Sequence, residues 1–139
     1  MNEKKNSGIR FDYVNLVSNH VSMIDSSVGV EYGLAVTSIK RNVVDGKLKI
    51  LVSFDLMKDV EKPAFSFTAT YSIGYKRDAD ACMSWDEFTN GYVLTHVLPY
   101  FREFVSSVTL RLPVPAVFIP PTNIDALLKQ YERSISAES

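Results

Sequence analysis

The sequence predicts an α+β fold, in which a four-stranded antiparallel meander sheet is followed by a long helix, a Pro-rich connector and a short C-terminal helix. Between Ile9 and Tyr75, four segments alternate apolar and polar residues with the two-residue period of a β-strand. From Leu94 to Leu112, apolar residues recur instead at helical spacing. The turns between the strands are short, which favours antiparallel pairing because parallel strands need long crossovers.

The first two strands are separated by the turn residues Asp25-Ser26-Ser27. The first is expected from Ile9 to about Met23, after a polar tail at residues 1–8. Its apolar residues share one face: Ile9, Phe11, Tyr13, Val17, Val21 and Met23. The second is expected from Val28 to Lys40, with Gly29 and Gly33 marking a bulge or a close backbone approach. One face of it carries Val30, Tyr32, Leu34 and Val36.

The third and fourth strands show the clearest alternation. Asp45-Gly46 is a strong hairpin signal, and the third strand follows it from about Leu48 to Leu56. A turn at residues 58–63 leads to the fourth strand, from Phe65 to Tyr75. A sheet of such long strands needs its apolar face covered and its edges paired, and self-association would meet both needs.

Two helices are expected after the sheet. Ser84 and Glu87 form a capping box that starts a short helical turn, and Gly91 is expected to break that turn before the long helix. The apolar stripe of the long helix consists of Leu94, Val97, Leu98, Phe101, Phe104, Val105, Val108 and Leu112. Pro99 lies within this pattern, so the helix either starts near it or kinks there. A second start signal, Thr122-Asn123-Ile124-Asp125, precedes a short helix with Ile124, Leu127, Leu128 and Tyr131 on one face.

The composition restricts the function classes. A chain of 139 residues suits a single domain over residues 1–139, and a net charge of −1 disfavours nucleic acid and anionic membranes as partners. The polar N-terminal residues predict no signal peptide. The sequence has no apolar run long enough for a membrane span and one cysteine, Cys82, so a cytoplasmic location is expected.

Catalytic and metal-binding groups are few. His20 and His96 are the only histidines, and with one cysteine they cannot form an ordinary zinc site without carboxylates. Cys82 lacks basic neighbours other than Arg77 that would lower its pKa, so it is interpreted as an inert thiol. We therefore expect no enzymatic activity, no cofactor and no metal.

The connector from Leu112 to Pro121 is unusual because an ordinary loop would be polar. It carries four prolines and the apolar residues Val114, Val117, Phe118 and Ile119. These side chains either pack on the sheet as core or help to line an exposed apolar groove, and the residues alone leave the two interpretations equally weighted.

The same region carries a resemblance to a known family. Leu98-Pro99-Tyr100 is followed by Arg102-Glu103, and then by Pro115-x-Val117-x-Ile119-x-Pro121-x-Asn123-Ile124-Asp125-Ala126-Leu127. This pattern resembles the signature of the SecB-type protein-export chaperones. The match runs without a gap through the long helix, the connector and the start of the second helix, whereas the strands are similar in pattern only.

The resemblance implies an ATP-independent holdase that keeps unfolded clients soluble and competent for translocation. Its groove would combine the connector residues with walls formed by Tyr32, Leu34, Leu127, Leu128 and Tyr131. It also implies a tetramer, a dimer of dimers, with the long helices sandwiched between sheets. That arrangement would place Leu98, Phe101, Arg102 and Val105 at the oligomer interface.

Two departures put docking on the export ATPase in doubt. The first-strand positions that are acidic in the family are His20 and Ile24 here, and the tail after Tyr131 is short. An alternative is therefore a dedicated SecB-like chaperone of a toxin–antitoxin system, which would protect an aggregation-prone antitoxin in the same groove. A third alternative, an enzyme of unknown type, is disfavoured by the few polar groups described above.

Overall fold

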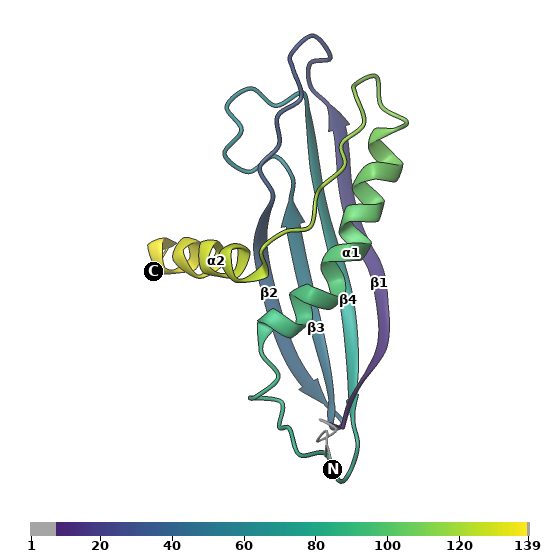
Figure 1. The fold of residues 1–139 in the computed structure, drawn as a ribbon, viewed down its shortest axis with the longest axis vertical. Helices are drawn as coiled ribbons and strands as arrows, with labels where there is room; N and C mark the ends of the chain where they lie inside the picture. Colours follow the sequence, from purple (N-terminus) through teal and green to yellow (C-terminus); the bar gives the residue numbers. More distant parts are fainter. Residues whose placement is uncertain (1–7, 139) are drawn as a thin grey trace, which may run out of the picture.

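The computed structural model describes residues 8–138 as one antiparallel sheet with two helices (Figure 1). The strands are β1 (Ile9–Met23), β2 (Ala35–Val44), β3 (Lys47–Asp55) and β4 (Phe65–Arg77), and the helices are α1 (Asn90–Thr109) and α2 (Ile124–Glu138). The predicted α+β class and element order are confirmed. Apart from Gly8, the tail predicted at residues 1–8 lies outside the described residues.

The strand order is β1-β4-β3-β2, so the predicted four-strand meander is wrong for the first strand. Only β2, β3 and β4 are joined as consecutive neighbours. β1 pairs with β4 along its whole length, from the Ile9–Arg77 pair to the Met23–Phe65 pair. The reason is the link at residues 24–34, which is long enough to cross the end of the sheet; there the backbone N–H of Ile24 bonds the carbonyl oxygen of Ala64 at 2.9 Å.

Register shifts in β1 also break the expected single-face alternation. One shift lies between Phe11 and Tyr13, and another between Leu16 and Ser18. Phe11 pairs with Tyr75, whereas Tyr13 pairs with its neighbour Gly74, so Phe11 and Tyr13 point to opposite faces of the sheet. Sequence periodicity placed them on one face because a bulge of this kind leaves no local signal.

The second strand begins later than predicted, at Ala35 instead of Val28. The preceding segment crosses beside the end of β3 and forms a single bridge between Gly33 and Met57. A Cβ atom on Gly33 would lie 2.5 Å from the carbonyl oxygen of Lys58, so the predicted close backbone approach is confirmed at Gly33. A Cβ atom on Gly29 would meet nothing within 4 Å, so a close approach there is wrong.

The capping box before the long helix is confirmed by two reciprocal hydrogen bonds. The backbone N–H of Ser84 bonds Glu87 Oε1 at 3.0 Å, and the backbone N–H of Glu87 bonds Ser84 Oγ at 3.3 Å. α1 itself starts at Asn90, so Gly91 lies in its first turn, and the helix continues through Pro99.

The core lies between α1 and one face of the sheet, which we call the inner face (Figure 1). Phe54 of β3 stacks on Phe101 of α1 with ring centroids 4.6 Å apart, and Phe67 of β4 meets the same ring edge-on at 5.9 Å. The opposite, outer face presents Ser53, Thr70 and other polar residues, and no helix of the described residues covers it. The connector crosses the inner face beside α1 and leads to α2 at the β2 edge (Figure 1).

Candidate functional site

The connector is held in place by two side chains of α1. The buried hydroxyl of Thr109 donates a hydrogen bond to the carbonyl of Val105 at 2.8 Å and accepts one from the backbone N–H of Val117 at 2.9 Å. Arg102 Nε donates to the carbonyl oxygen of Ile119 at 2.9 Å. These bonds take up the backbone polar groups of an extended segment that has no neighbouring strand among the described residues.

This anchoring resolves the two interpretations of the connector differently for neighbouring residues. Val117 and Ile119 are only 4% and 5% exposed and belong to the core, whereas Phe118 between them is 66% exposed. Val114 is half-buried. An extended backbone turns alternate side chains to opposite sides, and its inward side is already filled by the core. Phe118 instead lies over a shallow pocket beside Pro99 and Arg102 of α1.

α2 forms the next part of the site and is positioned by its N-terminal cap and by Tyr131 near its middle. Asn123 is its cap, because Asn123 Oδ1 accepts the backbone N–H of Ala126 at 3.0 Å; the start signal was thus predicted correctly but its side-chain cap is not Thr122. Further along, the Tyr131 hydroxyl accepts the backbone N–H of Ile39 on β2 at 3.2 Å. This bond fixes α2 against the edge of the sheet.

The other residues that were predicted to line the groove differ in how deeply they are buried. Leu127 is buried in the core, Leu128 and Tyr131 are half-buried, and Leu34 is half-buried in the segment before β2. Tyr32 is exposed in that same segment. A narrow cleft separates the start of β2 from α2, with Val36 and Gln130 among its lining residues.

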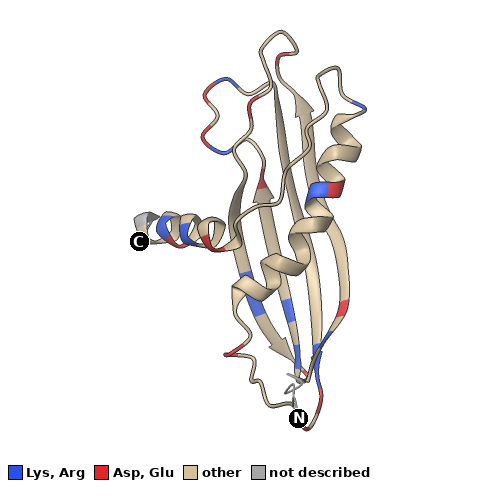
Figure 2. Ribbon diagram, viewed as in Figure 1, with Lys and Arg blue, Asp and Glu red and all other residues tan. Residues whose placement is uncertain are grey.

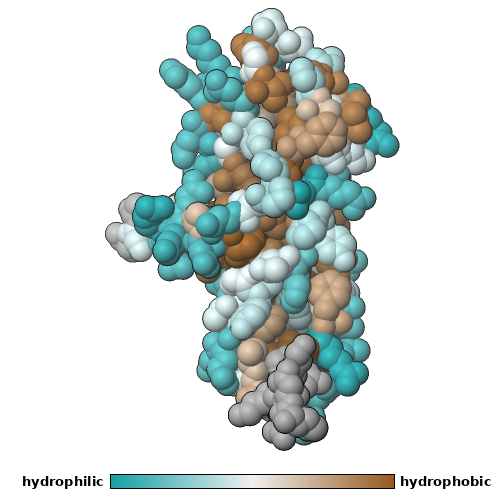
Figure 3. Space-filling model, in the orientation of Figure 1, coloured by the Kyte–Doolittle hydropathy of each residue, from teal (hydrophilic) through white to brown (hydrophobic). Residues whose placement is uncertain are grey.

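The structure thus divides the predicted groove into a sealed part and an accessible part. Val117, Ile119 and Leu127 are sealed. The accessible residues, which we call the connector surface, are Tyr32, Leu34, Val114, Phe118, Leu128 and Tyr131. Figure 3 shows apolar surface on both sides of the connector on this face of the molecule.

The predicted oligomer-interface residues need a correction. Leu98, Phe101 and Val105 are buried against the chain's own sheet, and Arg102 is engaged with the connector. Their helical periodicity marks the side of α1 that faces the core, so it could not also mark an interface. The apolar side chains that α1 and its end leave exposed are instead Tyr92, Tyr100 and Leu110, which the periodicity did not indicate.

The few side chains that were considered as catalytic candidates are not grouped into a site. His96 Nδ1 lies 2.9 Å from the Tyr75 hydroxyl, and partial burial lowers the pKa of His96. Burial also raises the pKa of Tyr75, so that phenol stays protonated. Cys82 and His20 are exposed, in a loop and on β1. Within residues 8–138, no group of His, Cys, Asp and Glu is arranged to hold a metal ion, and no helix is long and apolar enough to cross a membrane.

Comparison with solved structures identifies the fold. The chain is similar to a SecB-like chaperone, Rv1957 of Mycobacterium tuberculosis, solved in complex with a ChAD peptide from the Rv1956 HigA1 antitoxin. The TM-score is 0.69 at 13% sequence identity, and the match covers 82% of this chain and 90% of the other. The chain therefore has a SecB-like fold, as the sequence resemblance predicted.

A weaker similarity, with a TM-score of 0.43, links the chain to a protein of unknown function from Streptococcus agalactiae. It shares 12% identity and covers 81% of this chain and 97% of that one. No model of a known protein family and no curated protein sequence matches the chain.

Proposed function

From the SecB-like fold and the connector surface, we propose that the protein is an ATP-independent holdase that binds extended, apolar segments of unfolded client proteins. The observation that carries this proposal is Phe118, a large apolar side chain exposed on a segment whose backbone is anchored by Thr109 and Arg102. Such a surface favours binding because little conformational entropy is lost when a client segment covers it. No cofactor, metal or nucleotide takes part.

Client binding would come mainly from burial of apolar area. Covering a side chain of the size of Phe118 contributes about 2 kcal/mol, before the cost of ordering the client. Several such contacts along the connector surface are therefore needed for a useful affinity. The interaction depends on apolar area and not on a specific sequence, which suits a holdase that must accept different clients and keep them from folding or aggregating.

We further propose that the holdase is a cytoplasmic homo-oligomer, a tetramer built as a dimer of dimers. β1 is a long edge strand that exposes Phe11, Leu16 and Val17. The β2 edge is protected near Ile39 by Tyr131, so β1 is the edge better suited to pairing with a second copy. The exposed Tyr92 and Tyr100 of α1 would then replace the predicted buried residues at the contact between dimers.

The holdase proposal is tested by suppression of client aggregation. We expect the double variant Phe118→Asp with Tyr32→Asp to lose most protection of a chemically unfolded test enzyme, measured by light scattering. Both side chains are exposed, so the fold should persist; Leu127 is unsuitable for this test because it is buried.

A matched control replaces Val43, which is 51% exposed on β2 and distant from the connector, by Asp. This variant should protect the test enzyme as well as the wild type. Undiminished protection by the double variant, with its oligomeric state unchanged, would refute the assignment of the connector surface.

A second candidate function is a dedicated chaperone for one antitoxin. It is favoured by the similar fold of a SecB-like chaperone that was solved with an antitoxin peptide. In this case a toxin–antitoxin gene pair should lie beside the gene, and affinity purification from the native cell should recover one stoichiometric client. Recovery of many clients, without an adjacent gene pair, would favour the general holdase.

A further inference from the structure

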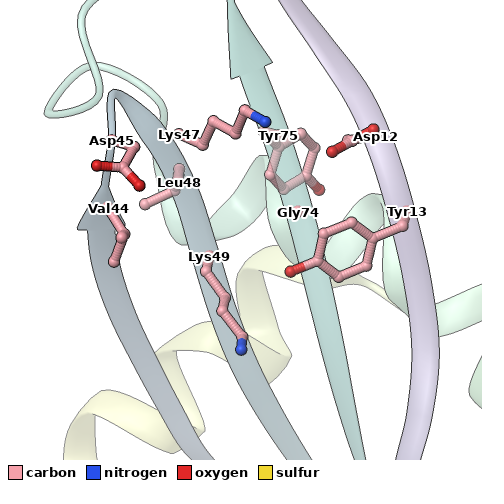
Figure 4. Close-up of a pocket in the computed structure, with 9 residues that line it drawn as sticks. All are labelled: Asp12, Tyr13, Val44, Asp45, Lys47, Leu48, Lys49, Gly74 and Tyr75. Carbon is pink, nitrogen blue, oxygen red and sulfur yellow. The ribbon is translucent and has the colours of Figure 1, made fainter.

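The outer face of the sheet carries a second candidate binding site, near the β2–β3 hairpin. In the strand register Lys49 pairs with Gly74, Gly74 pairs with Tyr13, and Val44 pairs with Lys47. These residues line a pocket of about 230 Å³ (Figure 4). The pocket lies on the face opposite to α1 and the connector, so it is separate from the connector surface.

Gly74 creates the space for this pocket. A Cβ atom at Gly74 would lie 2.0 Å from Tyr13 Cε1, so only glycine allows the Tyr13 ring to lie across β4. Figure 4 shows the ring reaching from β1 over Gly74 toward β3. The register shift after Phe11 is what turns Tyr13 to this face. The pocket therefore has an aromatic wall on one side and Val44 on the other.

Two lysines, Lys47 and Lys49, and two carboxylates, Asp12 and Asp45, line the pocket, and because Asp12 is paired with Lys76 a net positive charge remains. Lys47 and Lys49 are exposed and have no ion pair or side-chain hydrogen bond with any described residue. Lys76 is paired with Asp12, whose carboxylate lies 3.4 Å from the Lys76 ammonium. Figure 2 shows Lys and Arg gathered along β2 and β3 toward this end of the sheet.

We propose that this pocket docks an extended acidic segment of a partner protein, with an apolar side chain of that segment seated between Tyr13 and Val44. Charge complementarity to the unpaired ammonium groups of Lys47 and Lys49 selects the acidic segment. A nucleic acid fits less well, because its binding needs a broad positive surface, whereas the chain has a net charge of −1 and only two unpaired lysines line the pocket. The proposal does not rest on the holdase function, since it concerns the opposite face.

The test uses the full-length chain and a short fluorescent peptide of repeated Glu-Glu-Phe, with binding followed by fluorescence anisotropy. We expect binding that weakens as salt is raised from about 50 to about 200 mM. The double variant Lys47→Glu with Lys49→Glu should lose about ten-fold or more in affinity. Lys47→Gln with Lys49→Gln should give a smaller loss in the same direction, and Val44→Ser should weaken binding with little change in its salt dependence.

A charge-matched control is Lys129→Glu with Arg133→Glu, because both residues are exposed on α2, away from the pocket. Its affinity should stay within about two-fold of the wild type. An equal loss in this control would overturn the proposal, as would equal binding of a repeated Ser-Ser-Phe peptide. Tighter binding of a single-stranded oligonucleotide or of phosphatidylserine vesicles through Lys47 and Lys49 would also overturn it.

The aggregation assay separates failure of the docking proposal from failure of the holdase proposal. The Lys47→Glu and Lys49→Glu variant should still protect the unfolded test enzyme, because its connector surface is intact. Loss of protection in this variant, together with loss of peptide binding or without it, would contradict the separation of the two sites.

Discussion

The two faces of the sheet are made by the same strands but differ in the burial and the polarity of their side chains. On β4, the inner residues Phe65, Phe67 and Tyr71 are buried beneath helix and loop, whereas Thr68 and Thr70 lie on the open outer face. The inner face is closed by aromatic contacts with α1, while the outer face shows hydroxyl contacts such as Ser53–Thr70 at 2.7 Å. Stability is therefore concentrated on one face, which leaves the other free to vary in charge and shape.

The largest difference between the faces is expected from truncation of the central inner ring. Phe101→Ala should lower the free energy of unfolding by about 3–5 kcal/mol, because Phe101 is fully buried and contacts both Phe54 and Phe67. Lys49→Ala on the outer face should change it by less than about 0.5 kcal/mol. Urea unfolding at one fixed protein concentration measures both, and similar values for the two variants would contradict this division.

A smaller effect is expected where the connector joins the inner face. Thr109→Val keeps the side-chain shape but removes the acceptor for the buried N–H of Val117, which should cost about 1–3 kcal/mol. Thr109→Ser retains the hydroxyl and should recover most of that loss. Faster hydrogen exchange at the Val117 amide in the valine variant would identify the broken bond; equal protection in both variants would show that Thr109 does not anchor the connector.

On the outer face, Gly74→Ala should cost about 1 kcal/mol, because the new methyl group displaces the Tyr13 ring. In a Tyr13→Ala background the same change should be neutral or stabilising by about 0.5 kcal/mol, since alanine suits a strand better than glycine. A double-mutant cycle in urea unfolding provides the comparison. Additive effects would mean that the ring does not lie over Gly74.

The smallest effect is expected from the titration of His96 beside Tyr75 at the rim of the inner face. Because partial burial lowers its pKa below the ordinary 6.5, the unfolded chain binds this proton more readily. Stability should therefore be complete above about pH 6.5 and fall slightly as the pH drops from there to the lowered pKa. Thermal unfolding of the wild type and of His96→Gln across this range should show the decline in the wild type only.

Much of the fold could be predicted because its signals are local. Alternation located β1 and β4, and Asp45-Gly46 marked the hairpin, where both residues adopt positive φ angles. The prolines of the connector indicated that α1 ends before them, but α1 ends at Thr109, so Leu112 of the predicted stripe lies beyond the helix. The connector surface was harder to predict, since nothing in the sequence distinguishes exposed Phe118 from buried Val117 and Ile119 until the connector has a side that faces the core.

The residues alone therefore specify which segments form strands and helices, and the apolar stripes of β3, β4, α1 and α2, because these depend on side-chain spacing over a few positions. Which surfaces stay open depends on contacts between distant parts of the chain. The pairing of β1 with β4, the register shift that turns Tyr13 outward and the Thr109 bond that holds the connector are contacts of this kind. Backbone hydrogen bonds between remote segments follow no sequence period, so these features emerge only when the chain is folded.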